Sequence, residues 1–129
     1  MSGKANVKVT IHAEYLKELD EAAQRALVQT AEAVLHTEVV PAQVMPFKEG
    51  HLQNDATFVD SSEAGSGHVD LVSSTPYARR LYYHPEYRFD KTENPNAGAG
   101  WFDDWAEGGA NQNFAEETFA ALFKREAGL

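Results

Sequence analysis

The sequence predicts a single α+β domain in which a long N-terminal helix packs on a small, mostly antiparallel sheet. The spacing of apolar residues changes from a period of two to a helical period at Glu14. A stretch rich in glycine and serine joins two later apolar segments, as expected for a hairpin connection. The length of 129 residues is that of one domain, so residues 1–129 are expected to share one core.

Three segments have the pattern of strands. Apolar and polar residues alternate over 7–11, which predicts a first strand with one covered face. Further strands are expected at 56–60 and 68–73, and the intervening residues 61–67 have the composition of a hairpin connection.

The long helix is expected from about Glu14 to Glu38. Within it, apolar and small residues recur three or four positions apart, and we expect Leu19, Leu27 and Val34 to be buried against the sheet. Pro41 is expected to end the helix by moving the residue before it out of helical geometry.

The rest of the chain alternates between irregular and helical patterns. Residues 46–52 indicate a turn in which Gly50 is left-handed, and residues 77–83 fit either a strand or a helical turn. Residues 84–112 form a long aromatic loop without a regular pattern. A C-terminal helix is expected from Asn113 to about Glu126.

The composition excludes several classes of protein. The absence of cysteine rules out disulfides, thiolate catalysis and thiolate-ligated metal sites. Eleven basic residues against 20 acidic ones give a net charge of −9, which disfavours specific nucleic-acid binding. No apolar stretch approaches the roughly 18 residues of a membrane span, so we expect a soluble protein without membrane contacts.

Catalytic and metal sites have weak support. The sequence lacks the GxSxG, P-loop and HExxH patterns, so neither catalytic residues nor a cofactor are expected. A metal-dependent hydrolase built from the histidines and Asp103 or Asp104 is a competing hypothesis, but a solvated acidic face beside the tryptophans is favoured over it. The five histidines have no recognised ligand spacing: His12, His36, His51, His68 and His84.

Aromatic and basic residues concentrate in 77–87, and both tryptophans lie in the loop 84–112. Such residues are enriched at protein interfaces. The alternative is that the tryptophans fold back and cap this domain's own sheet. The candidate interface residues are Tyr77, Arg79, Arg80, Tyr87, Trp101, Phe102 and Trp105.

The run from Thr75 to Tyr87, followed by residues 94–98 and Trp101-Phe102, resembles the minor capsid proteins of long-tailed bacteriophages and prophages. The upstream segment from Pro46 to Leu52 is similar to a pattern in the wider group of head-tail joining and tail-completion proteins. This resemblance extends through most of the chain.

The resemblance implies a non-catalytic structural protein of the virion neck, made in the cytoplasm of a bacterial host. Its expected partners are copies of itself in a cyclic homo-oligomer, together with neighbouring neck, portal-side or tail proteins. DNA would pass through the ring without specific binding, for which an acidic lining is suitable. The competing hypothesis is a small adaptor module that binds another protein through the loop 84–112.

Overall fold

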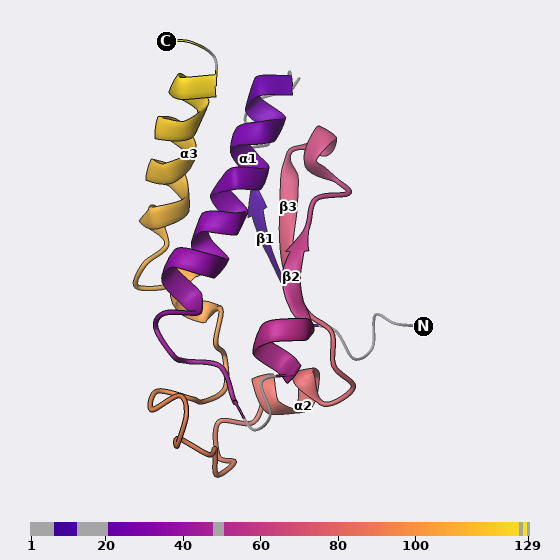
Figure 1. The fold of residues 1–129 in the computed structure, drawn as a ribbon, viewed down its shortest axis with the longest axis vertical. Coiled ribbons are helices and arrows are strands. Elements are labelled where there is room, and N and C mark those ends of the chain that lie inside the picture. Colours follow the sequence, from indigo (N-terminus) through magenta and orange to yellow (C-terminus); the bar gives the residue numbers. More distant parts are fainter. Residues whose placement is uncertain (1–6, 13–20, 48–50, 127, 129) are drawn as a thin grey trace.

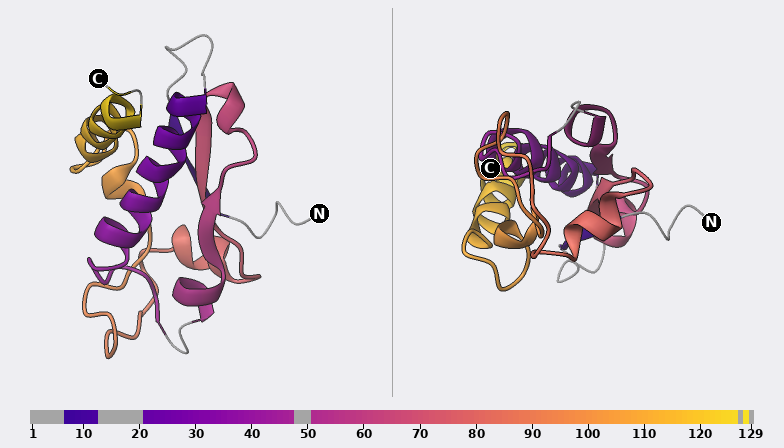
Figure 2. Two further views of the ribbon diagram at one scale, coloured as in Figure 1. Left: turned by 45° about the horizontal axis from the view of Figure 1, so that its top comes forward. Right: turned by 90° about the horizontal axis from the view of Figure 1, so that it is seen from below.

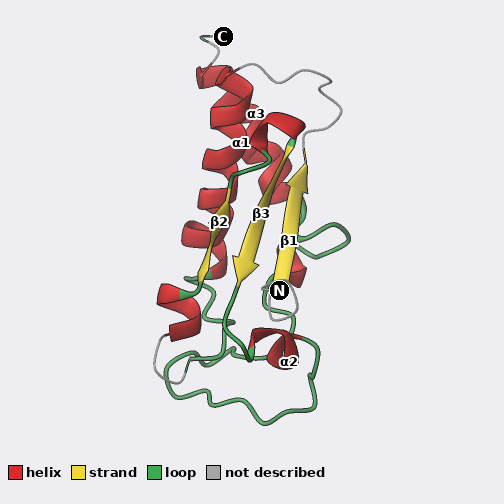
Figure 3. Ribbon diagram, turned by 90° about the vertical axis from the view of Figure 1, so that its right-hand side faces the viewer, coloured by secondary structure: helices red, strands yellow, loops and turns green. Residues whose placement is uncertain are grey.

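The computed structural model describes residues 7–12, 21–47, 51–126 and 128. Among them a three-stranded antiparallel sheet is formed by β1 (Val7–His12), β2 (Thr57–Asp60) and β3 (His68–Ser73). Strand β3 lies between the other two, so β1 and β2 are the edges (Figure 3). The predicted strands and the hairpin between β2 and β3 are confirmed.

Two helices lie on the same side of the sheet. Helix α1 (Glu21–Ala33) crosses the sheet, and α3 (Asn113–Glu126) runs beside α1 (Figure 1). The further views in Figure 2 show the same arrangement. At their outer ends the two helices are joined by the Arg25 guanidinium, which donates to the Glu126 carboxylate at 2.7 Å. The predicted α+β class and the C-terminal helix are confirmed.

The first helix ends in a different way from the one predicted. After α1 the chain continues as a π-helical segment, η2 (Val34–Val39), in which the Val40 N–H donates to the Leu35 carbonyl at 2.9 Å. Val40 keeps helical angles, with φ −63° and ψ −49°. The predicted reason for the helix end is therefore wrong. Pro41 has no N–H, so it cannot donate the next helical hydrogen bond. The last helical residue is Val39, one residue beyond the predicted end at Glu38, and a turn follows.

The core lies between α1 and the sheet. Leu27 and Val34 are almost fully buried, as predicted, and they belong to the same apolar cluster as Val69 and Leu71 of β3. The small residues of α1 allow close packing on the strands. The predicted helix start at Glu14 and the predicted core residue Leu19 lie outside the described residues.

Short helical turns connect these elements. The hairpin contains η4 (Ala64–Ser66) and ends on Gly67, whose φ of 93° favours glycine. A π-helical turn, η3 (His51–Asp55), precedes β2, and the predicted left-handed Gly50 lies outside the described residues. Residues 77–83 contain a short helix, α2 (Ala78–Tyr82), so the helical alternative is the one observed.

Residues 84–112 are irregular apart from a 3₁₀ turn, η5 (Asp103–Trp105). This agrees with the predicted long loop. None of the described helices combines the length and apolar character needed to cross a membrane.

Candidate functional site: an aromatic and basic surface

Helix α2 separates buried from exposed side chains within one turn. Ala78 and Tyr82, four residues apart, face the core, whereas Arg79, Arg80 and Tyr83 face outward. Burial of Ala78 and Tyr82 fixes the short helix on the domain. The orientation of the two arginines and Tyr83 follows from this anchoring.

The exposed side chains form a continuous surface with the turn that follows α2. The Arg79 guanidinium lies over the Tyr83 ring, 5.9 Å from its centroid, and the His84 ring stacks on Tyr87 at 4.6 Å. A shallow hollow is lined by Pro76, both arginines, Tyr83 and His84. We name this surface the aromatic-basic patch and define it by Tyr77, Arg79, Arg80, Tyr83, His84 and Tyr87.

The patch contains most of the exposed large apolar side chains of the described residues. Those side chains are Phe58, Tyr77, Tyr83 and Tyr87, and three of the four fall in the patch. Tyr83 is 62% exposed although Tyr82 beside it is only 6% exposed. A cluster of this kind has the character of an interaction surface rather than of scattered surface residues.

A polar contact fixes the outer part of the patch. His84 Nδ1 lies 2.7 Å from the Glu86 carboxylate. This hydrogen bond lowers the pKa of Glu86 below its usual value. The contact spans Pro85 and holds the His84 ring, on which Tyr87 stacks, beside Glu86.

The charge of the patch differs in sign from that of the rest of the chain. Residues 76–91 carry four basic and two acidic residues, whereas the remainder carries seven basic and 18 acidic residues. Arginine and tyrosine together can pair with carboxylates and bury aromatic area. The patch is therefore suited to contact an acidic protein surface.

The tryptophans do not belong to this surface. Trp101, Phe102 and Trp105 are 2%, 0% and 8% exposed, and all three join the core cluster. Their predicted role as interface anchors is not supported, because they present almost no area to a partner. The alternative, in which the tryptophans fold back on their own domain, is the arrangement observed: Trp101 bonds to Ser73 of the sheet, and Trp105 bonds to Glu38 of η2.

A chain of hydrogen bonds explains why this part of the loop folds inward. The Trp101 indole N–H donates to Ser73 Oγ at 3.2 Å, and Ser73 Oγ lies 2.8 Å from Thr57 Oγ1. Thr57 donates to the Leu52 carbonyl at 2.7 Å, so its proton is used there and Ser73 must donate to Thr57. The indole is thus joined to the two neighbouring strands β3 and β2.

Asparagines hold the preceding segment. The Asn94 amide donates to the Met45 carbonyl at 2.8 Å and to the Gln53 side chain at 2.9 Å. Asn96 donates to the Ala42 carbonyl at 2.9 Å. Residues 94–98 therefore lie beside residues 42–45, with further backbone hydrogen bonds between the two segments.

One of the two aspartates considered for a metal-dependent hydrolase, Asp103, takes part in a contact within the fold. Asp103 accepts a hydrogen bond from the Tyr82 hydroxyl, and burial together with this bond raises the pKa of Tyr82. Within the described part of the chain, no group of three or more histidine, aspartate or glutamate side chains is placed to hold a metal ion.

The structure thus leaves four of the seven predicted interface residues exposed on and around α2 and three in the core. It adds Tyr83 and His84 to the candidate site. The four-residue spacing of Arg79 and Tyr83 indicates Tyr83 once residues 78–82 are taken as helical. His84 has no such sequence signal, because its stacking on Tyr87 depends on the turn at Pro85.

No protein-family model, curated protein or solved structure matches this chain.

Proposed function

We propose that this chain is a non-catalytic structural protein of the neck of a long-tailed phage or prophage particle, where it joins the DNA-filled head to the tail. The observation that supports a role in protein contacts is the aromatic-basic patch on a chain that is otherwise acidic. The neck as the setting rests on the resemblance of residues 75–102 to minor capsid proteins.

The patch provides the contact in this proposal. Copies of the chain form a closed ring, and the patch contacts a neighbouring copy or an adjoining portal-side or tail protein. Tyr83 supplies aromatic area, while Arg79 and Arg80 pair with carboxylates. Because a heterologous contact that closes produces a ring, one such patch in each copy is sufficient.

Deletion of the gene from the phage or prophage that carries it tests this function. We expect filled heads and free tails that are not joined, as seen by negative-stain electron microscopy. Supplying the wild-type protein in trans should restore joined particles. Joined, infectious particles without the protein would contradict the proposal, as would a gene neighbourhood that lacks portal, capsid and tail genes.

A variant with Arg79→Glu, Arg80→Glu and Tyr83→Ala tests the patch in the same assay. We expect at least a tenfold loss of joined particles, because both the charge and the aromatic area are removed. The matched control is Lys124→Glu with Arg125→Glu, which reverses an exposed basic pair at the end of α3. Restoration of joined particles by both variants would show that the patch is not needed for this function.

The stoichiometry of the purified protein separates the two hypotheses: a one-to-one complex with a single partner would favour the adaptor hypothesis over a ring.

A further inference from the structure

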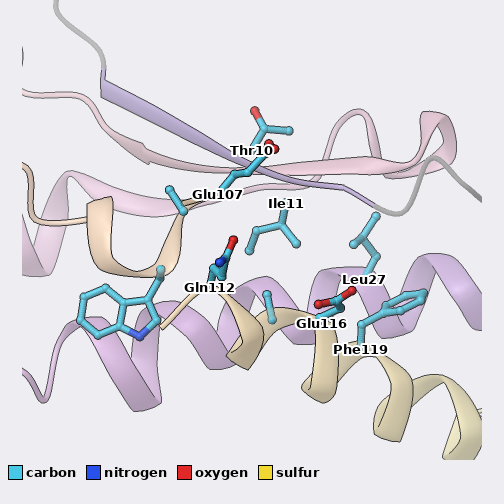
Figure 4. Close-up of a pocket in the computed structure, with 10 residues that line it drawn as sticks. Thr10, Ile11, Leu27, Glu107, Gln112, Glu116 and Phe119 are labelled. Carbon is cyan, nitrogen blue, oxygen red and sulfur yellow. The ribbon is translucent and has the colours of Figure 1, made fainter. Parts of the chain in front are cut away.

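A second candidate site lies on another part of the molecule, in a groove between β1 and the first turns of α3 (Figure 4). The groove has a volume of about 310 Å³. Its apolar lining comes from four elements and includes Ile11, Leu27, Trp105 and Phe119. Figure 4 shows Ile11 pointing from the strand toward the helix.

The groove includes the outer edge of β1. Thr10 and Ile11 are consecutive residues of a strand and so point to opposite faces of the sheet, and yet both line the groove. Thr10 is turned toward Asp70 on the central strand, to which its hydroxyl donates at 2.6 Å. No described strand pairs with β1 on this side. An extended segment is therefore able to pair here as an additional strand.

The charged groups of the groove have one sign. Glu107 and Glu116 line it, and no basic residue does. Both are exposed, and neither forms an ion pair or hydrogen bond with a described residue. A lysine or arginine side chain fits this combination, because its stem packs on the partly exposed Ile11 while its charge meets the carboxylates.

A second copy of this chain is a poor source of such a segment. The mostly exposed part of its long loop, residues 84–93, contains Arg88 and Lys91 but also three acidic residues. That stretch is net acidic and would be repelled by Glu107 and Glu116. The complementary occupant is a basic segment of another protein.

We infer that the groove between β1 and α3 binds an extended basic segment of a partner protein, which adds to the sheet at β1. Alternate side chains of the segment lie toward the groove, with lysine or arginine against Glu107 and Glu116. This site shares no residue with the aromatic-basic patch. It therefore goes beyond the proposed function and does not depend on it.

Calorimetric titration of the full chain with a short synthetic peptide of alternating lysine and valine tests the site. We expect binding, and a loss of affinity of about tenfold or more in the double variant Glu107→Gln and Glu116→Gln. The matched control is Glu117→Gln, which removes a neighbouring exposed charge on α3 outside the groove and should change the affinity less than about twofold.

A second peptide with the same charge but with proline at its centre separates strand pairing from simple charge attraction. Proline cannot donate to the ladder, so this peptide should bind at least about fivefold more weakly. The inference is overturned by absence of binding, by equal binding of the proline peptide, or by a glutamate-valine peptide that binds as well. A wild-type dimer that dissociates in the Glu107→Gln, Glu116→Gln variant would also overturn it, because a second copy would then be the occupant.

Discussion

The two halves of the irregular stretch after α2 are held in different ways. Residues 83–93 are mostly exposed and are tied mainly by contacts among near neighbours, such as the stacking of His84 on Tyr87. Residues 94–105 are linked to distant parts of the chain by Asn94, Asn96 and the two indoles, which donate to partners between 28 and 67 positions away.

This difference teaches that aromatic content alone does not separate an interface from a core. Both halves are rich in aromatic side chains, but the buried indoles have fixed acceptors in Ser73 and Glu38. The rings of Tyr83 and Tyr87 lie on the surface. For the two tryptophans, an acceptor inside the domain therefore accompanies burial of the ring.

The largest expected effect is a difference in the free energy of unfolding between a variant in residues 94–105 and a variant in residues 83–93. Trp101→Ala should lower the free energy of unfolding by about 3–5 kcal/mol, because it leaves a cavity beside Ser73. Tyr83→Ala should change it by less than about 0.5 kcal/mol. Urea unfolding followed by circular dichroism measures both. Similar losses in the two variants would abolish the distinction between the halves.

A smaller loss of unfolding free energy is expected for substitution of Asn94, at the start of residues 94–105. Asn94→Ala should lower the free energy of unfolding by about 1–3 kcal/mol, because the buried Met45 carbonyl loses its side-chain donor. The control Asn96→Ala removes an amide that is exposed to water, and its loss should stay below about 1 kcal/mol. A smaller loss for Asn94→Ala than for Asn96→Ala would show that burial of the amide does not set the strength of this attachment.

The smallest effect concerns the first half and its titration. The hydrogen bond from His84 lowers the pKa of Glu86, so the stabilisation from this contact is present above the usual glutamate pKa and is lost as the pH falls through the lowered value. In His84→Gln the pKa of Glu86, measured by NMR, should rise. The unfolding midpoint at neutral pH should not change measurably, since Glu86 is exposed to solvent. An unchanged Glu86 pKa would show that His84 does not hold this turn.

The sequence predicts those parts of the fold that depend on local patterns. Alternating apolar residues locate β1, the hairpin composition of 61–67 locates β2 and β3, and the helical spacing from Ala115 to Phe123 locates α3. The way in which the first helix ends was not predicted. Val40 was expected to leave helical geometry because a proline follows it, but it keeps helical angles at the end of the π-helical segment. A proline changes the preference of the preceding residue without fixing it.

The candidate site was only partly predictable for a similar reason. Arg79 and Arg80 follow from the density of basic and aromatic residues around them. The burial of Trp101 depends on Ser73, which is 28 positions away and has no local pattern that pairs it with an indole. The groove beside β1 was not predicted at all, because Thr10 and Glu116 come together only when the strand and the last helix are packed.

The order of the strands also affects how the chain folds. Strand β1 pairs with β3, so Thr10 meets Asp70 across 60 positions, and Arg25 of α1 meets Glu126 across 101 positions. Contacts this far apart close large loops and slow folding. During synthesis the β2–β3 hairpin can form early, whereas α1 lacks its helical partner until residues 113–126 have been made. A chain shortened within α3 therefore loses the packing partner of α1.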